Sequence, residues 1–353
     1  MKKFNKIKNS LVVGALISCS AAFGGNEDRI GSAGASQMLI NPWARSSAWG
    51  DAGVSCVNGL EATFTNIAGL AFTDRTQIKF NYTNWLGSAD IGLSSAGIAQ
   101  RVSDQDVIAV SIQSYGLGDI DITTADLPEG GVGTFTPRLS IVNVGYAREF
   151  SNSIYGGFNL KVMSESIANL RSTGVAFDAG VRYVTGEQDH VKFGISLKNV
   201  GPTMRFSGDG LATPIFYQST GEVATLEQRS SAYEMPSQLV MGASYDFLFS
   251  EESKLTAAFA FTANSFSNDQ YRIGLDYGMA LEKAAFNIRA GYVLEKNIFN
   301  VDDRTNALTG LTAGFSVDAL AGANKSPLGL EYAMRLSNPF GVIHTFGVTI
   351  SLK

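Results

Sequence analysis

The sequence predicts an all-β protein: a 14-stranded antiparallel transmembrane β-barrel of the outer membrane with an N-terminal plug segment. Apolar residues alternate with polar or small ones in runs of about ten from residue 76 onward, as in strands with one apolar and one polar face. The composition is rich in Gly (38 residues), Phe (22) and Tyr (12), while charged residues make up only 17%. The chain also begins with an export signal. Together these features favour a membrane barrel and exclude a disordered chain.

Residues 1–24 are predicted to be a secretory signal peptide. Four Lys precede residue 10, an apolar stretch covers residues 11–22, and small residues flank a cleavage site after Gly24. The apolar stretch is shorter than the roughly 20 residues of a membrane-spanning helix. The residues Leu-Ile-Ser-Cys ending at Cys19 resemble a lipobox, so a lipidated Cys19 is the alternative N-terminus. Both alternatives export the chain.

Several other classes are excluded by composition. After residue 22 no apolar run approaches 18 residues, which excludes a helical inner-membrane protein. The net charge of −5 argues against nucleic acid as a partner. Two His and two Cys cannot supply a multi-ligand zinc site alone, and we expect no metal or cofactor.

Residues 76–353 form the predicted barrel domain. Its strands are expected to begin near Thr76, Asp90, Asp106, Arg138, Ser153, Ser172, His190, Ser237, Lys254, Gln270, Ala284, Ala307, Pro327 and Val342. A soluble β-sandwich would show the same alternation, but these runs exceed the ~5–6 residues of typical soluble strands. Short polar gaps also alternate with longer ones, as periplasmic turns alternate with outer loops. In the last strand Val348 and Ile350 should face lipid, and Gly347 and Thr349 the lumen.

The polar faces of the strands combine Gly, Ser and Thr with full charges, and small Gly suits a tightly packed lumen. Seven of the charged residues form a predicted lumen charge network: Asp178, Arg182, Arg272, Asp276, Arg289, Glu331 and Arg335. Their signs nearly balance, whereas an ion filter would carry one dominant sign. We therefore expect internal ion pairs that fill the barrel.

Residues 25–75 do not alternate like membrane strands. Trp43, Trp49 and Phe64 need burial, so this segment is expected to lie on the periplasmic side and to reach into the lumen as a plug. A flexible leader is the alternative.

The long gap between the seventh and eighth strands, residues 200–236, is the candidate partner-binding outer loop. Its aromatic residues Phe206, Phe216, Tyr217 and Tyr233 lie among Gly, Ser and Thr. Exposed aromatic side chains are common anchors for protein partners. Packing of the loop over the barrel mouth is the alternative.

Two motifs in the plug segment carry a family resemblance. The first is Pro-x-Ala-Arg-x-x-x-x-Gly-x-Ala-Gly-Val, with Pro42, Ala44, Arg45, Gly50 and Gly53. The second is Asn-x-Ala-Gly-Leu-Ala-Phe, with Asn66, Ala68 and Gly69. Together with the pattern at residues 195–202, they resemble the PorV/PorQ family of FadL-like outer-membrane barrels from Bacteroidetes. Ile67 replaces the usual Pro and Trp49 a common Met, so the chain resembles a divergent member.

The resemblance implies a role in the type IX protein secretion system. PorV-like proteins bind the translocon barrel and collect cargo through its C-terminal domains, whereas PorQ-like proteins belong to the surface attachment complex. The resemblance thus implies these proteins and outer-membrane lipid as partners, and no enzymatic activity. A FadL-like transporter of hydrophobic small molecules is the alternative function, although the charged lumen argues against it.

A catalytic site is not expected. His190 lies at a predicted short turn and His344 at the start of the last strand. A Ser-His-Asp hydrolase needs a His beside both partners, and no sequence feature marks such a Ser or Asp.

Overall fold

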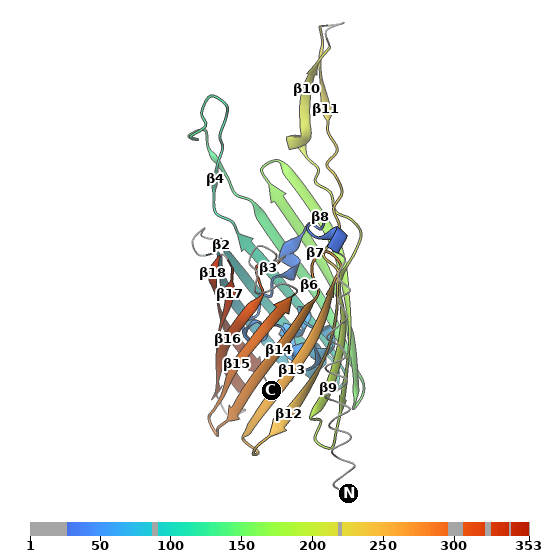
Figure 1. Cartoon of the computed structure of the whole chain (residues 1–353), viewed down its shortest axis with the longest axis vertical. Helices are drawn as coiled ribbons and strands as arrows, with labels where there is room; N and C mark the ends of the chain where they lie inside the picture. The colour runs from blue at the N-terminus through green and yellow to red at the C-terminus, as the bar shows by residue number, and fades with distance from the viewer. Residues whose placement is uncertain are drawn as a thin grey trace.

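The computed structural model describes residues 27–86, 91–217, 221–295, 306–321, 326–338 and 340–352. Fourteen antiparallel strands close into one barrel (Figure 1). They are β1 Thr76–Leu86, β2 Ile91–Arg101, β3 Asp106–Gly116, β6 Arg138–Ser151, β7 Ile154–Ile167, β8 Leu170–Thr185, β9 Val191–Val200, β12 Gln238–Leu248, β13 Ser253–Asn264, β14 Gln270–Ala280, β15 Ala284–Glu295, β16 Gly310–Ala321, β17 Ser326–Ser337 and β18 Gly341–Leu352. The predicted signal peptide and Cys19 lie outside the described residues.

The predicted barrel is confirmed, and its strand starts are accurate. The largest deviation is in β16, which begins at Gly310 where Ala307 was expected. Consecutive strands pair in order, and β1 closes the ring against β18, with Thr76 opposite Leu352 and Tyr82 opposite Phe346. Closure leaves no free strand edge in the wall.

The alternation in sequence becomes two faces of the wall. In β18, Val348 and Ile350 are 36% and 37% exposed on the outside, while Thr349 is 3% exposed in the lumen, as expected. Side chains at successive strand positions point to opposite faces, so one apolar and one polar stripe suffice to separate lipid from lumen. In the described part of the chain no helix is long and apolar enough to cross a membrane.

Two long loops stand at one end of the barrel (Figure 1). One carries the short strands β4 (Ile120–Asp121) and β5 (Thr134–Phe135), and the other β10 (Ala212–Phe216) and β11 (Val223–Glu227). Long loops mark the outer end of such barrels. The first and last barrel residues, Thr76 and Leu352, therefore lie at the periplasmic end.

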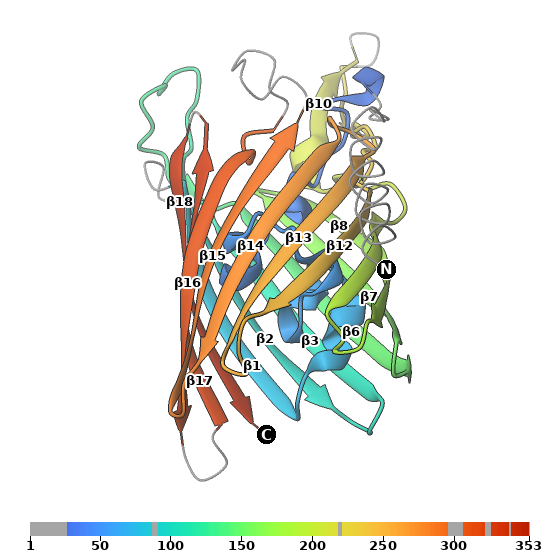
Figure 2. The ribbon, with the colours of Figure 1, turned by 60° about the horizontal axis from the view of Figure 1, so that its bottom comes forward.

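Most of the N-terminal segment lies inside the ring of strands, and its first turn lies at the outer mouth near the β10–β11 loop (Figure 2). It consists of short elements: η2 Glu27–Arg29, η3 Ser36–Leu39, α2 Ala44–Ala48, η4 Gly53–Ser55, η5 Gly59–Thr63 and η6 Ile67–Phe72. We call residues 27–75 the plug. Trp43, Leu60 and Leu70 are fully buried within it, which accounts for the aromatic and apolar residues that needed burial.

The plug differs from expectation in its direction. Its first residues contact the outer loops, since Arg29 pairs with Glu234 and the N–H of Gly31 bonds the carbonyl of Phe266. The chain then descends through the lumen and reaches the periplasmic end only at Thr76, where β1 begins. The plug is therefore anchored at the outer mouth and not only from the periplasmic side.

Candidate functional site

The first plug motif builds a helical turn against the C-terminal strands. Pro42 is buried and precedes α2, whose Ala44 and Ala48 pack against Ala333 of β17. Arg45, on the same turn, donates from Nε to a Glu331 oxygen at 2.6 Å and from Nη2 to Asp318. The motif thus fixes one face of α2 to the wall and directs a guanidinium at two wall carboxylates.

The two glycines of this motif lie in the turn after α2, where the backbone conformation and close packing favour Gly. Gly50 has a φ of +69°, a left-handed conformation that Gly adopts without cost. Gly53 lies beneath the Trp49 ring, and an added Cβ would come within 2.5 Å of a ring carbon. Trp49, a departure from the family pattern, therefore packs on a residue that the pattern retains.

The second motif holds the plug on the opposite side of the lumen. Asn66 caps η6 by accepting from the N–H of Ala68 at 3.2 Å, and its Nδ2 donates to the carbonyl of Val54 at 2.8 Å. Gly69 faces the carbonyl of Val57 so closely that no Cβ fits. Ile67, which replaces the usual Pro, is 2% exposed. This half of the plug packs its apolar residues against β3, β6, β7 and β8.

Wall glycines receive the plug. At each of nine lumen-facing glycines, an added Cβ would lie under 3.0 Å from a plug atom: Gly97, Gly145, Gly180, Gly194, Gly242, Gly274, Gly291, Gly314 and Gly329. Real Cβ atoms essentially never approach that closely. The abundance of Gly on the polar face therefore reflects close contact between sheet and plug.

The lumen charges divide into separate groups instead of one network. Glu331 binds Arg45 and, at 3.0 Å, Lys79 of β1. Asp276 pairs with Arg289 at 3.0 Å.

Asp51 and Asp178 organise two further groups. Asp51, on the plug, accepts from Arg335 at 2.8 Å and lies 3.8 Å from Arg272. Asp178 pairs with Lys161 at 2.7 Å. Each predicted acid in the lumen therefore has a cation beside it, and buried charges need such partners.

Arg182 is held differently. Its Nη1 donates to the carbonyl of Val57 at 3.0 Å and to Asn58 at 2.7 Å, and its Cζ lies 3.9 Å from the centroid of the Phe72 ring. The plug backbone and an aromatic face thus bind this guanidinium.

Sequence reasoning missed several members of these groups. Glu61 pairs with Lys79 and also caps α2 by accepting from the N–H of Ser46 at 2.7 Å. Lys161 was among the charges that alternation placed on the polar faces, and Lys79 also lies on such a face, so alternation could have found it. Glu61 and Asp51 lie in plug turns, where no periodicity marks an inward residue.

The candidate partner-binding loop divides into a base and a tip. At the base, Phe206 packs against Tyr233 with ring centroids 5.8 Å apart. The Tyr233 hydroxyl donates to Glu165 at 2.6 Å and lies 2.8 Å from Ser172. Burial, and then the bond to Glu165, raise the pKa of Tyr233 to about 12. The base is therefore fixed to β7 and β8.

At the tip, Phe216 and Tyr217 are 62% and 51% exposed, and they belong to the β10–β11 hairpin that stands above the barrel (Figure 1). Val223 and Leu226 of the same hairpin are 68% and 53% exposed. Of the four aromatic candidates, Phe206 and Tyr233 pack over the mouth, while Phe216 and Tyr217 project outward, and their role in partner binding stays a prediction.

A cavity of about 430 Å³ lies at the outer mouth, beside the first residues of the plug. Apolar residues of the plug, of β1 and of the loops line it together with polar residues of β12 and β13: Ile30, Leu39, Ile40, Trp85, Phe266, Leu308, Gln238 and Asn264. A second cavity of about 440 Å³ between β9 and β12 shares Gln238 and Asn264 with it. These two amides bond each other at 2.6 Å where the cavities adjoin.

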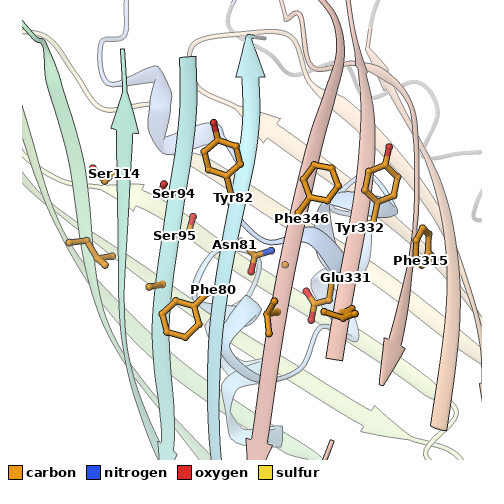
Figure 3. A pocket seen from close by; sticks show the side chains of 15 residues that line it. Phe80, Asn81, Tyr82, Ser94, Ser95, Ser114, Phe315, Glu331, Tyr332 and Phe346 are labelled. Atoms are coloured by element: carbon orange, nitrogen blue, oxygen red, sulfur yellow. The ribbon is translucent and has the colours of Figure 1, made fainter. Parts of the chain in front are cut away.

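The lipid-facing wall carries a groove of about 950 Å³ over the β1–β18 junction. Tyr82, Phe346, Tyr332 and Phe315 lie opposite one another on four neighbouring strands and form its aromatic rim (Figure 3). Ser94, Ala96 and Ser114 line the groove from the adjoining strands β2 and β3. Its aromatic and aliphatic side chains face outward, while Asn81, Ser95 and Glu331 of its lining are buried on the lumen side of the same strands.

No catalytic arrangement emerges among the described residues. No group of three or more His, Cys, Asp or Glu in the described ranges could hold a metal ion. His344 lies on the outer wall with Nδ1 2.9 Å from the Tyr332 hydroxyl, and the His190 ring stacks edge-on against Tyr245. Each histidine thus has an aromatic neighbour.

Solved structures of FadL-like outer-membrane proteins share this closed-barrel fold. The Pseudomonas putida toluene transporter TodX has a TM-score of 0.54 and 11% identity, over 88% of this chain and 98% of its own. CymD, a monoaromatic hydrocarbon channel, has a TM-score of 0.52 and 13% identity, over 89% and 97%. A Pseudomonas aeruginosa FadL homologue has a TM-score of 0.51 and 11% identity, over 87% and 96%. At these identities the likeness shows the fold alone.

The family follows from the sequence. Residues 24–268, more than half of the chain, match the family model described as type IX secretion system protein PorV. The chain therefore belongs to the PorV family, an outer-membrane barrel family of type IX secretion. A comparison with the curated proteins finds no match.

Proposed function

We propose that this protein is a non-enzymatic outer-membrane component of type IX secretion that binds protein partners at its outer end. The partners would be the translocon barrel, the C-terminal domains of secreted cargo, or proteins of the attachment complex. The observation that carries this proposal is the β10–β11 hairpin, which holds exposed Phe216, Tyr217, Val223 and Leu226 above the membrane. Exposed apolar clusters of this kind are typical of protein interaction sites.

The construction of the loop base supports the same proposal. Tyr233 bonds Glu165 and Ser172, and the neighbouring Glu234 pairs with Arg29 of the plug. A hairpin fixed at its base presents its tip in a limited range of orientations, which reduces the entropy lost on binding. The filled lumen favours a binding role over a channel role.

The experiment is a purification in mild detergent from outer membranes, with an affinity tag on the periplasmic C-terminus. The test variant replaces residues 212–227 with a short Gly-Ser turn, and the matched control shortens the β4–β5 loop in the same way. Wild type and control should retain a large barrel or cargo proteins sharing a C-terminal domain, and the test variant should lose them. Equal recovery from all three would contradict a role for the hairpin.

A FadL-like transporter is the second candidate, and the mouth cavity is the observation that favours it. Its volume of about 430 Å³ falls within the range of small-molecule sites. Transport through the wall would require separation of Gln238 and Asn264, which bond where the two cavities adjoin. Recovery of the barrel without protein partners, but with a bound fatty acid or similar molecule, would favour transport.

A further inference from the structure

The β10–β11 hairpin is a two-stranded sheet outside the barrel, and it has two edges. All five residues of β11 are exposed, as are four of the five in β10. An isolated two-stranded sheet is only marginally stable in water, and an added strand stabilises it. The two edges differ in whether they can accept an added strand.

The hydrogen-bond pattern identifies the groups on each edge. The N–H of Tyr217 bonds the carbonyl of Glu222 at 2.9 Å, and that of Gln228 bonds the carbonyl of Leu211 at 3.0 Å. Bonded and non-bonded pairs alternate along an antiparallel ladder, so the register makes Ile215–Ala224 and Thr213–Leu226 the bonded pairs between them. The backbone groups of the remaining positions point outward: Ala212, Pro214 and Phe216 on β10, and Val223, Thr225 and Glu227 on β11.

The two edges therefore differ. Pro214 has no N–H and occupies the middle outward position of β10, which prevents a regular ladder on that side. On β11 the three outward positions each offer both an N–H and a carbonyl. Proline on an edge is a common way to block strand pairing, and here it blocks one edge and leaves the other open.

We propose that the outward edge of β11 binds an extended strand of a protein partner by backbone pairing. The proposal rests on the proposed function, and it specifies how the outer hairpin recognises its partner. Val223 and Leu226 lie on opposite faces of the sheet and are exposed, so they favour a partner strand with apolar residues on both faces. Glu222 and Glu227 lie at the two ends of β11, which favours Lys or Arg at the ends of that strand.

A second copy of this chain fits the edge less well. Two copies of one edge that pair about a two-fold axis run antiparallel only when the axis is perpendicular to the strands. An axis parallel to the strands leaves the two copies parallel. Copies in one membrane are related by an axis along the membrane normal, and the hairpin stands along that direction (Figure 1). The partner strand therefore comes from another protein.

The test measures binding of the full-length barrel in lipid nanodiscs to the purified C-terminal domain of a type IX cargo protein. Thr225→Pro removes an outward N–H without touching a bond between β10 and β11, and Thr225→Val is the control that keeps the N–H. We expect Thr225→Pro to raise the Kd at least about tenfold and Thr225→Val to change it less than about twofold. Glu227→Pro, at the end of the edge, should weaken binding in the same direction.

Hydrogen exchange separates pairing from misfolding. Binding should protect the amides of Val223, Thr225 and Glu227, while those of Ala224 and Leu226 are already bonded within the hairpin. If Thr225→Pro opens the hairpin, hydrogen exchange at Ala224 and Leu226 rises in the free protein. The affinity of Glu227→Pro then tests edge pairing in place of Thr225→Pro.

Three outcomes would overturn the inference. Equal affinities of the proline variants and the control would overturn edge pairing and leave the proposed function standing. No binding by wild type would overturn the cargo role and the inference with it. Cross-linking of hairpins between copies, lost in Thr225→Pro, would assign the edge to self-association.

Discussion

Arg45 of the plug and Glu331 of β17 form a hydrogen-bonded ion pair, with Nε 2.6 Å from the carboxylate oxygen. Glu331 is fully buried at its side chain, and it also lies 3.0 Å from Lys79. One wall carboxylate thereby connects the plug motif to the first strand. The pair adds a charged contact to the packing of Ala44 and Ala48 against Ala333.

Loss of this pair should destabilise the barrel. Removing one partner of a buried pair costs about 3–5 kcal/mol. Lys79 still neutralises Glu331, but Asp318 loses the guanidinium that it binds, so we expect Arg45→Met to cost about 3–5 kcal/mol. The measurement is the free energy of unfolding in urea with the protein in lipid vesicles. Arg205→Met, at an exposed arginine of the outer loop, is the control and should change stability by less than about 0.5 kcal/mol. A loss below about 1 kcal/mol in Arg45→Met would contradict a structural role for the pair.

A wall glycine should not tolerate even a methyl group where the plug touches it. At Gly291 an added Cβ would lie under 3.0 Å from backbone atoms of Trp49, so Gly291→Ala should cost about 1–3 kcal/mol through overpacking. At Gly116 the nearest atom is 3.9 Å away, so Gly116→Ala serves as the matched strand control and should be neutral. Unfolding curves of the two variants are compared. Equal stabilities would mean that the plug does not press on the wall.

Charge on the lipid-facing wall should be costly in a depth-dependent way. Val348→Arg, within β18, is expected to cost about 2–4 kcal/mol, and Leu352→Arg, at the periplasmic end, about 0–1 kcal/mol. Refolding into lipid vesicles across a denaturant titration measures both. If Val348→Arg inserts as readily as Leu352→Arg, the assignment of faces in β18 is wrong.

The base of the outer loop should respond to alkaline pH. The pKa of Tyr233 is raised to about 12, above the roughly 10 of an unfolded tyrosine. A raised pKa contributes stability below the unfolded value that is lost as pH rises through the folded value, so the loop base should loosen between about pH 10 and 12. Limited proteolysis of the outer loop across that range reports the change.

Tyr233→Phe is the control for this pH effect. It removes the hydroxyl that bonds Glu165 and Ser172, so cleavage should already be faster at neutral pH and should lack the step between pH 10 and 12. An unchanged step in Tyr233→Phe would assign it to another group.

The barrel could be predicted from sequence because alternation is a local property. Each strand has one apolar and one polar face, so the alternation between Thr76 and Leu352 locates each strand without knowing which strands it pairs with. β16 shows where this fails: it was expected to begin at Ala307 and begins at Gly310, because the turn residues before it are also apolar or small.

The plug could be predicted to be buried but not which way it runs. Burial of the plug follows from Trp43, Trp49 and Phe64. The direction in which the plug runs depends instead on long-range contacts such as that between Arg29 and Glu234, which are 205 positions apart in the sequence. The same holds for the lumen pairs. A sequence shows that Glu331 faces inward, but only the closed ring brings Lys79 and Arg45 to it.

The course of the plug also constrains how this protein can be assembled. Residues 27–75 run from the outer mouth to the periplasmic end inside a ring of paired strands, with Trp43 and Trp49 buried on the way. A finished ring could admit such a segment only by threading bulky indoles past the wall. The ring must therefore close around a plug already seated on the sheet. The β1–β18 junction joins the barrel strand that follows the plug in sequence to the last barrel strand described, and we expect it to be the seam that closes last.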